Sequence, residues 1–95
     1  GEGLMSLAVS KGNVEMVDFL IKQKVSVQGS GARLPLIRAI QNNNIVLVEK
    51  LINAGANVNA MAKNGNTPLL SAIGRGNVEI VEQLVKHGAD LKMTT

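Results

Sequence analysis

Few side chains in this sequence could do acid–base or nucleophilic chemistry. His87 is the single histidine, and the chain has no cysteine. A Ser-His-acid triad needs a histidine base beside its nucleophile and its acid, and no such set can be assembled around His87. Glu79 and Glu82 are three residues apart, which places them on one face of a helix, but nothing near them indicates a cleft. The sequence therefore predicts a protein that is not an enzyme.

Ligand-binding chemistry is equally sparse. One histidine without cysteine makes a zinc site improbable, so we predict no metal ion and no cofactor. Gly74-Arg75-Gly76 has neither the preceding strand nor the Lys-Ser/Thr pair of a phosphate-binding loop, so we expect no small-molecule substrate. His87 precedes Gly88 at a predicted helix end, where a histidine favourably meets the negative end of the helix dipole.

The composition indicates one small helical domain. The chain has 95 residues, of which 45% are hydrophobic, and Phe19 is its single aromatic residue. A core of Leu, Ile, Val, Ala and Met suits short packed helices better than a β-sandwich, whose strands favour aromatic residues. No apolar run approaches the roughly 20 residues of a membrane span. The absence of cysteine is compatible with the cytoplasm or the nucleus, which we expect as the location.

A repeat organises the whole chain. Gly12-Asn13-Val14-Glu15-Met16-Val17 reappears as Gly76-Asn77-Val78-Glu79-Ile80-Val81, with Asn43-Asn44-Ile45-Val46-Leu47-Val48 between them. Leu34-Pro35-Leu36 and Thr67-Pro68-Leu69 are 33 residues apart, and the first two copies are 31 apart. A period of this size indicates a stack of similar units. We expect one domain over residues 1–95, with repeats over about 1–29, 30–61 and 62–95.

Each repeat is predicted to hold two helices. The first helices are expected over Leu4–Lys11, Pro35–Asn42 and Pro68–Arg75, and the second over Val14–Gln23, Ile45–Ala54 and Val78–His87. The second helices carry an apolar stripe that indicates one buried face. Asn13, Asn44 and Asn77 stand at the N-cap positions of these helices, and Gly55 and Gly88 at the left-handed positions that follow them. Lys24 holds the equivalent place in the first repeat, and if it is forced into the left-handed conformation the cost is on the order of 1 kcal/mol.

These residues resemble ankyrin repeats. The match is carried by Gly65-Asn66-Thr67-Pro68-Leu69, Gly76-Asn77 and Gly88-Ala89-Asp90, and in the middle copy by Pro35-Leu36 and Gly55-Ala56-Asn57-Val58-Asn59-Ala60. The resemblance implies an all-α solenoid of stacked helix–turn–helix units with hairpin-like loops. The family's usual Thr-Pro-Leu-His is incomplete here, because Leu70 stands in the histidine position and Leu34 in the threonine position.

The resemblance also implies a function, which is the binding of a partner protein or peptide by the loop tips and the concave face of the first helices. Carried onto this sequence, the contact residues are Ser10, Lys11, Ser30, Gly31, Arg33, Gln41, Asn42, Met61, Lys63, Asn64, Asn66 and Arg75. Arg33 and Arg75 are the strongest candidates, because arginine is enriched at interface hot spots. The basic residues in this set favour an acidic partner. The family also has asparagines that cytosolic hydroxylases modify, and Asn59 resembles them.

Two other functions stay open. Leu4, Val14 and Val17 at one end, and Val78, Val81 and Val85 at the other, lack the polar replacements that terminal repeats normally carry. We therefore expect a segment of a longer array, or self-association through exposed ends. A nucleic-acid or anionic-membrane binder is less favoured, because the net charge of +3 comes from scattered rather than clustered basic residues. Met5 and Met16 are expected in the core.

Overall fold

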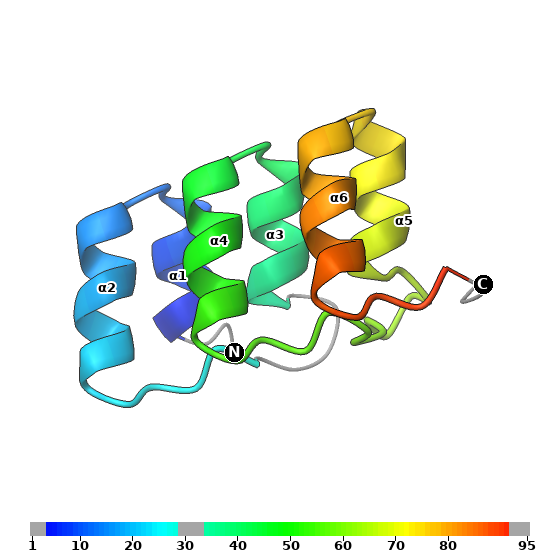
Figure 1. Cartoon of the computed structure of the whole chain (residues 1–95). Coiled ribbons are helices and arrows are strands. Elements are labelled where there is room, and N and C mark those ends of the chain that lie inside the picture. Colours follow the sequence, from blue (N-terminus) through cyan, green and yellow to red (C-terminus); the bar gives the residue numbers. More distant parts are fainter. Residues whose placement is uncertain (1–3, 29–33, 92–95) are drawn as a thin grey trace.

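The computed structural model describes residues 4–28 and 34–91, and this part of the chain contains six helices and no strand. The helices stand side by side (Figure 1). They are α1 (Leu4–Ser10), α2 (Val14–Lys22), α3 (Pro35–Gln41), α4 (Ile45–Asn53), α5 (Pro68–Arg75) and α6 (Val78–Lys86). All six predicted helices are present. Five of them end one residue earlier than predicted, because the last predicted residue is the C-cap or lies beyond it.

Side-chain caps fix where the helices begin. The side-chain oxygens of Asn13, Asn44 and Asn77 accept hydrogen bonds from the third backbone N–H of α2, α4 and α6, at 3.0, 3.2 and 3.2 Å. The Thr67 hydroxyl accepts likewise from the Leu70 N–H at 3.2 Å. Leu34 provides no side-chain cap to α3, which begins with a proline at its first position. The N-caps predicted at Asn13, Asn44 and Asn77 are thus confirmed.

Left-handed residues terminate the helices. Gly55 and Gly88 have φ of 99° and 97°, and Lys24 in the equivalent position has φ of 64°. Lys24 therefore does adopt the left-handed conformation that carries this cost. Asn43 also has positive φ, 57°, where Gly76 stands in the third repeat. Asparagine tolerates this conformation better than most residues, which explains why no glycine is needed there.

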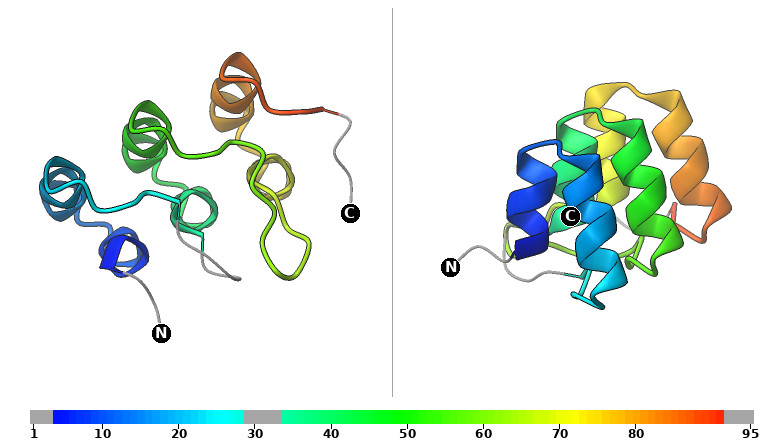
Figure 2. Two further views of the ribbon diagram at one scale, coloured as in Figure 1. Left: turned by 90° about the horizontal axis from the view of Figure 1, so that it is seen from below. Right: turned by 90° about the vertical axis from the view of Figure 1, so that its left-hand side faces the viewer.

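The helices form two rows. The odd-numbered helices make one row and the even-numbered helices the other, as the end-on view shows (Figure 2). Each helix contacts its sequence partner and its counterparts in the neighbouring repeats. The core fills the space between the rows and runs the length of the stack. Its fully buried members include Val9, Val17, Ile40, Leu47, Val48, Leu51, Ile80 and Leu84. The predicted all-α solenoid is confirmed.

The loop between α4 and α5 is anchored to α3. Leu34, Ile37 and Ala62 form a small buried cluster of their own. A tight turn closes this loop, with the Gly65 N–H donating to the Ala62 carbonyl at 2.9 Å. Packing and turn together give residues 59–66 a definite path away from the helix rows.

The two ends of the stack expose apolar side chains, as predicted. Leu4 is 65% exposed at one end and Val78 is 68% exposed at the other. Two expectations need correction. Val17 lies fully in the core rather than at the exposed end. Met16 is 46% exposed rather than buried, because no helix pair in the described part of the chain covers α2 on that side. Met5 is buried, as expected.

Candidate interaction surface

The predicted contact residues separate into two groups at opposite ends of the first helices. Ser30, Gly31 and Arg33 lie outside the described residues. One group, at the C-terminal ends of α1, α3 and α5, consists of Ser10, Lys11, Gln41, Asn42 and Arg75. The other lies in the loop before α5 and consists of Met61, Lys63, Asn64 and Asn66. The eight residues of α5 hold the groups about 12 Å apart, at about 1.5 Å per residue.

The first group contains a regular row of polar residues. Lys11, Asn42 and Arg75 occupy equivalent positions in the three repeats, and we call them the helix-end row. All three are exposed. The side chains of Lys11 and Arg75 form no hydrogen bond or ion pair within the described part of the chain. The row therefore has a cation at each end with no partner among the described residues.

Ser10 and Gln41 differ in how they could serve this surface. Gln41, the last residue of α3, is exposed. Ser10 is half-buried, and its hydroxyl oxygen is buried without a hydrogen-bond partner among the described residues. An unsatisfied buried hydroxyl costs about 1–3 kcal/mol. The inward placement of this oxygen means that Ser10 does not offer its polar atom to a partner in this conformation.

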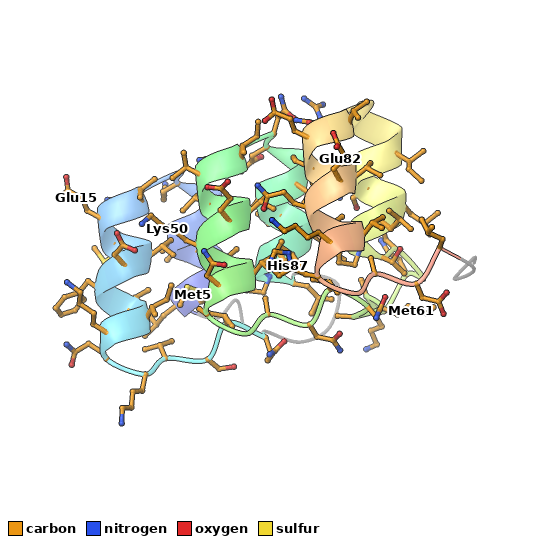
Figure 3. All side chains as sticks on the ribbon, viewed as in Figure 1. Met5, Glu15, Lys50, Met61, Glu82 and His87 are labelled. Carbon is orange, nitrogen blue, oxygen red and sulfur yellow. The ribbon has the colours of Figure 1, made fainter. Side chains whose placement is uncertain are left out.

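The second group combines exposed side chains with a side chain that forms hydrogen bonds within the fold. Met61 is 51% exposed, and Lys63 and Asn64 are exposed beside it, although the Asn64 side-chain oxygen accepts a hydrogen bond from the Asn66 N–H at 3.0 Å. We call these three residues the loop tip, and Met61 marks it in Figure 3. Asn66 is different, because its amide nitrogen donates to the Ser71 hydroxyl at 2.8 Å and its oxygen accepts from the Thr67 N–H at 3.1 Å. Asn66 therefore shapes the start of α5 rather than presenting free polar atoms.

Residues between the two groups were not included in the sequence prediction of the surface. Arg38 and Leu70 are half-buried on α3 and α5, and Gly74 is exposed near the end of α5. A Cβ atom added at Gly74 would meet no other group within 4 Å. One signal could have found them. These positions differ strongly between the copies, with Leu7 and Ser71 equivalent to Arg38, and Ser10 and Gln41 equivalent to Gly74.

Asn59, the predicted hydroxylation site, bridges two repeats. Its amide nitrogen donates to the Gly88 carbonyl at 3.1 Å, and its oxygen accepts from the Asp90 N–H at 2.7 Å. Gln28 makes the same pair of contacts one repeat earlier, to the Gly55 carbonyl at 2.7 Å and from the Asn57 N–H at 2.9 Å. These side chains thus tie each loop to the next. Hydroxylation of Asn59 stays a prediction.

The remaining candidates for chemistry are dispersed. One ring nitrogen of His87, Nδ1, lies 2.9 Å from the Gln83 carbonyl at the end of α6, which agrees with the predicted helix-end role (Figure 3). Among the described residues, no three His, Cys, Asp or Glu side chains are grouped to hold a metal ion. Nor is any helix of this part long and apolar enough to cross a membrane.

Known proteins resemble this chain in sequence and in structure. Residues 4–95 match the family described as ankyrin repeats (three copies). Over 70 residues, 68% of the chain, the sequence is 40% identical to the B-cell lymphoma 3 protein homolog of Mus musculus, and this stretch covers 16% of that protein. The structure is similar to the crystal structure of the ankyrin repeat domain of Bcl-3, a protein described as a unique member of the IkappaB protein family. Here the TM-score is 0.89 at 35% identity, with 96% of this chain and 41% of that chain covered.

Proposed function

Because this chain belongs to the ankyrin-repeat family, we propose that it is a non-catalytic module that binds a partner protein or peptide. Ankyrin repeats are units of protein–protein interaction. The chain spans less than half of the Bcl-3 domain and a smaller share of the mouse protein, so the partner and the location in cytoplasm or nucleus belong to this proposal.

The helix-end row is the observation that carries the proposal. Stacked helices fix its spacing along a molecule whose longest dimension is 34 Å. Lys11 and Arg75 hold exposed cations at its two ends without ion pairs to described residues. We propose that an acidic segment of the partner lies along this row, with the loop tip as a second contact on its other side. Complementary charge would favour both the rate of encounter and the choice of partner.

Charge reversal tests this assignment. The double variant Lys11→Glu/Arg75→Glu, which reverses both cations of the helix-end row, should lose proteins that the unchanged chain captures from a cell lysate. For a captured partner, the dissociation constant should rise at least about tenfold, which corresponds to about 1.4 kcal/mol. Isothermal titration calorimetry on the purified partner measures the change.

A matched control reverses two charges elsewhere. Lys22 and Lys86 are exposed at the ends of α2 and α6, on the other helix row. The variant Lys22→Glu/Lys86→Glu carries the same change in net charge and should retain the captured proteins. If both double variants bind the partner as tightly as the unchanged chain, the helix-end row is not the binding surface.

A further inference from the structure

Polar pairs join the second helices of successive repeats. Between α2 and α4, the Lys50 Nζ lies 3.1 Å from an Asp18 carboxylate oxygen. Between α4 and α6, the Gln83 Nε2 donates to the Glu49 Oε1 at 2.7 Å. In the repeat alignment Asp18 and Glu49 share one position, and Lys50 and Gln83 share the next. Each junction therefore sets an acid on one repeat against a donor on the following repeat.

The last repeat presents the acid of such a pair without its donor. Glu82 occupies the position of Asp18 and Glu49, is exposed on α6 (Figure 3), and has no hydrogen bond or ion pair with any described residue. Val78, Val81 and Val85 lie on the same helix, and a shallow hollow of about 490 Å³ includes Glu82 and the last two. We call these four residues the C-terminal end face.

The middle repeat shows what normally covers this face. Val48 and Ile52, the counterparts of Val81 and Val85, are 0% and 7% exposed because the third repeat packs on them. Val81 is half-buried and Val85 is 39% exposed. The helix that packs there in the middle repeat is α6, in which Ile80 and Leu84 flank the donor Gln83. In α4 the residues at the same spacing are Leu47, the donor Lys50 and Leu51.

The other end of this chain lacks that pattern. Met16 and Leu20 hold the two apolar positions of α2, but Phe19 stands where the donor belongs and is 56% exposed. A second copy stacked head to tail would therefore set its Phe19 against Glu82. The carboxylate would lose water without gaining a donor, which is unfavourable. Self-stacking is the wrong match for this face.

We propose that the C-terminal end face docks a helix pair from a partner that carries a Lys or Gln donor in the spacing apolar-x-x-donor-Leu, and that Phe19 keeps the chain's own N-terminal end from filling this role. The pair supplies selectivity more than affinity, because partly exposed ion pairs stabilise only weakly. This surface is separate from the helix-end row, so the proposal does not depend on the proposed function.

A variant of the chain itself can serve as the donor-bearing probe. The variant Phe19→Lys/Glu82→Lys gains the donor at its N-terminal end and loses the acid at its own C-terminal end, so it cannot form long stacks through this pair. The acceptor is the unchanged chain, labelled with ¹⁵N and titrated to about millimolar probe in an NMR experiment. Phe19 is exposed, so its replacement should leave the fold intact, which circular dichroism verifies.

Three comparisons isolate the pair. The control probe Phe19→Met/Glu82→Lys keeps an unbranched stem without a charge, and it should bind about two- to fivefold more weakly than the lysine probe. The acceptor Glu82→Gln should remove this difference. The acceptor Glu79→Gln changes the same residue type one turn earlier on α6 and should preserve it. The shifts should centre on the amides of Val81, Glu82 and Val85.

Other outcomes overturn the proposal. Equal binding of the lysine and methionine probes would show that no donor is read at this face. An unchanged preference in the Glu82→Gln acceptor would place the contact elsewhere, and the absence of shifts at millimolar probe would show that the face docks no such helix. Self-association of the unchanged chain that Glu82→Lys abolishes would run through the C-terminal end face and show that Phe19 does not exclude its own copies.

Discussion

Lys24 is the residue with the plainest local cost in this structure. Its φ of 64° lies in the left-handed region, where glycine stands in both other repeats. A side chain in this region costs roughly 1–2 kcal/mol, since Cβ approaches the following carbonyl oxygen. Lys24 is exposed, and its side chain forms no hydrogen bond or ion pair with a described residue that would offset the cost.

Replacing Lys24 by glycine should therefore stabilise the protein. We expect Lys24→Gly to raise the free energy of unfolding by about 0.5–1 kcal/mol, because the relief of strain exceeds the extra freedom that glycine gives the unfolded chain. Urea denaturation measures the change. Lys24→Ala is the control, since it removes the charge and keeps the strained Cβ. Equal stabilities of the two variants would show that charge, not backbone conformation, sets the effect.

The surface predicted from sequence was incomplete at the residue scale for identifiable reasons. The positions of Lys11, Asn42 and Arg75 follow from the repeat alignment, so their common row was within reach of sequence. The inward hydroxyl of Ser10 depends on how neighbouring helices pack, which no local pattern encodes. Asn66 looks like a free loop residue until its contact with Ser71 is seen.

At the scale of elements, the helices were predictable and the ties between repeats were not. Each capped helix begins at a residue whose side chain accepts a hydrogen bond from the N–H three residues later. Such a short-range signal is visible in the sequence. Gln28 and Asn59 bridge 27 to 31 residues of chain, from the Gly55 carbonyl to the Asp90 N–H, and only the fold brings those atoms together.

The inter-repeat hydrogen bonds of Gln28 and Asn59 should control local opening of the loop that each of them holds. We expect Asn59→Ala to speed hydrogen exchange at the Asp90 amide about fivefold or more, because loss of one hydrogen bond corresponds to about 1 kcal/mol. The Asn57 amide should be unaffected. Gln28→Ala should give the reverse pattern, so each variant is the control for the other. Equal acceleration of both amides in either variant would indicate global destabilisation instead.

Over the whole molecule, stability should depend on position in the stack. Each repeat contacts its neighbours, so the middle repeat is supported on two sides and the last, within the described part, on one. Leu51 and Leu84 are equivalent residues, and both are fully buried. They differ in the number of neighbouring repeats that pack against the repeat in which each leucine lies.

Truncating these two leucines should show how the middle repeat and the last repeat differ in their contribution to the stability of the stack. Leu51→Ala and Leu84→Ala should each cost about 2–5 kcal/mol. Native-state hydrogen exchange should show lost protection throughout the stack for Leu51→Ala, and chiefly in α5 and α6 for Leu84→Ala. The same loss in all helices for both variants would mean that the three repeats unfold as one unit.

The turn at the loop tip has a consequence for how such a protein can change over time. Ala62 is held against α3, Gly65 closes the turn, and the Asn64 side-chain oxygen accepts from the Asn66 N–H at 3.0 Å, so Lys63 is the residue between them that projects beyond what the turn requires. Substitutions at Lys63 alter what the molecule presents to its surroundings without disturbing its packing, whereas Asn64 also serves the turn. The scaffold and the recognition surface can therefore evolve, or be randomised in a library, almost independently.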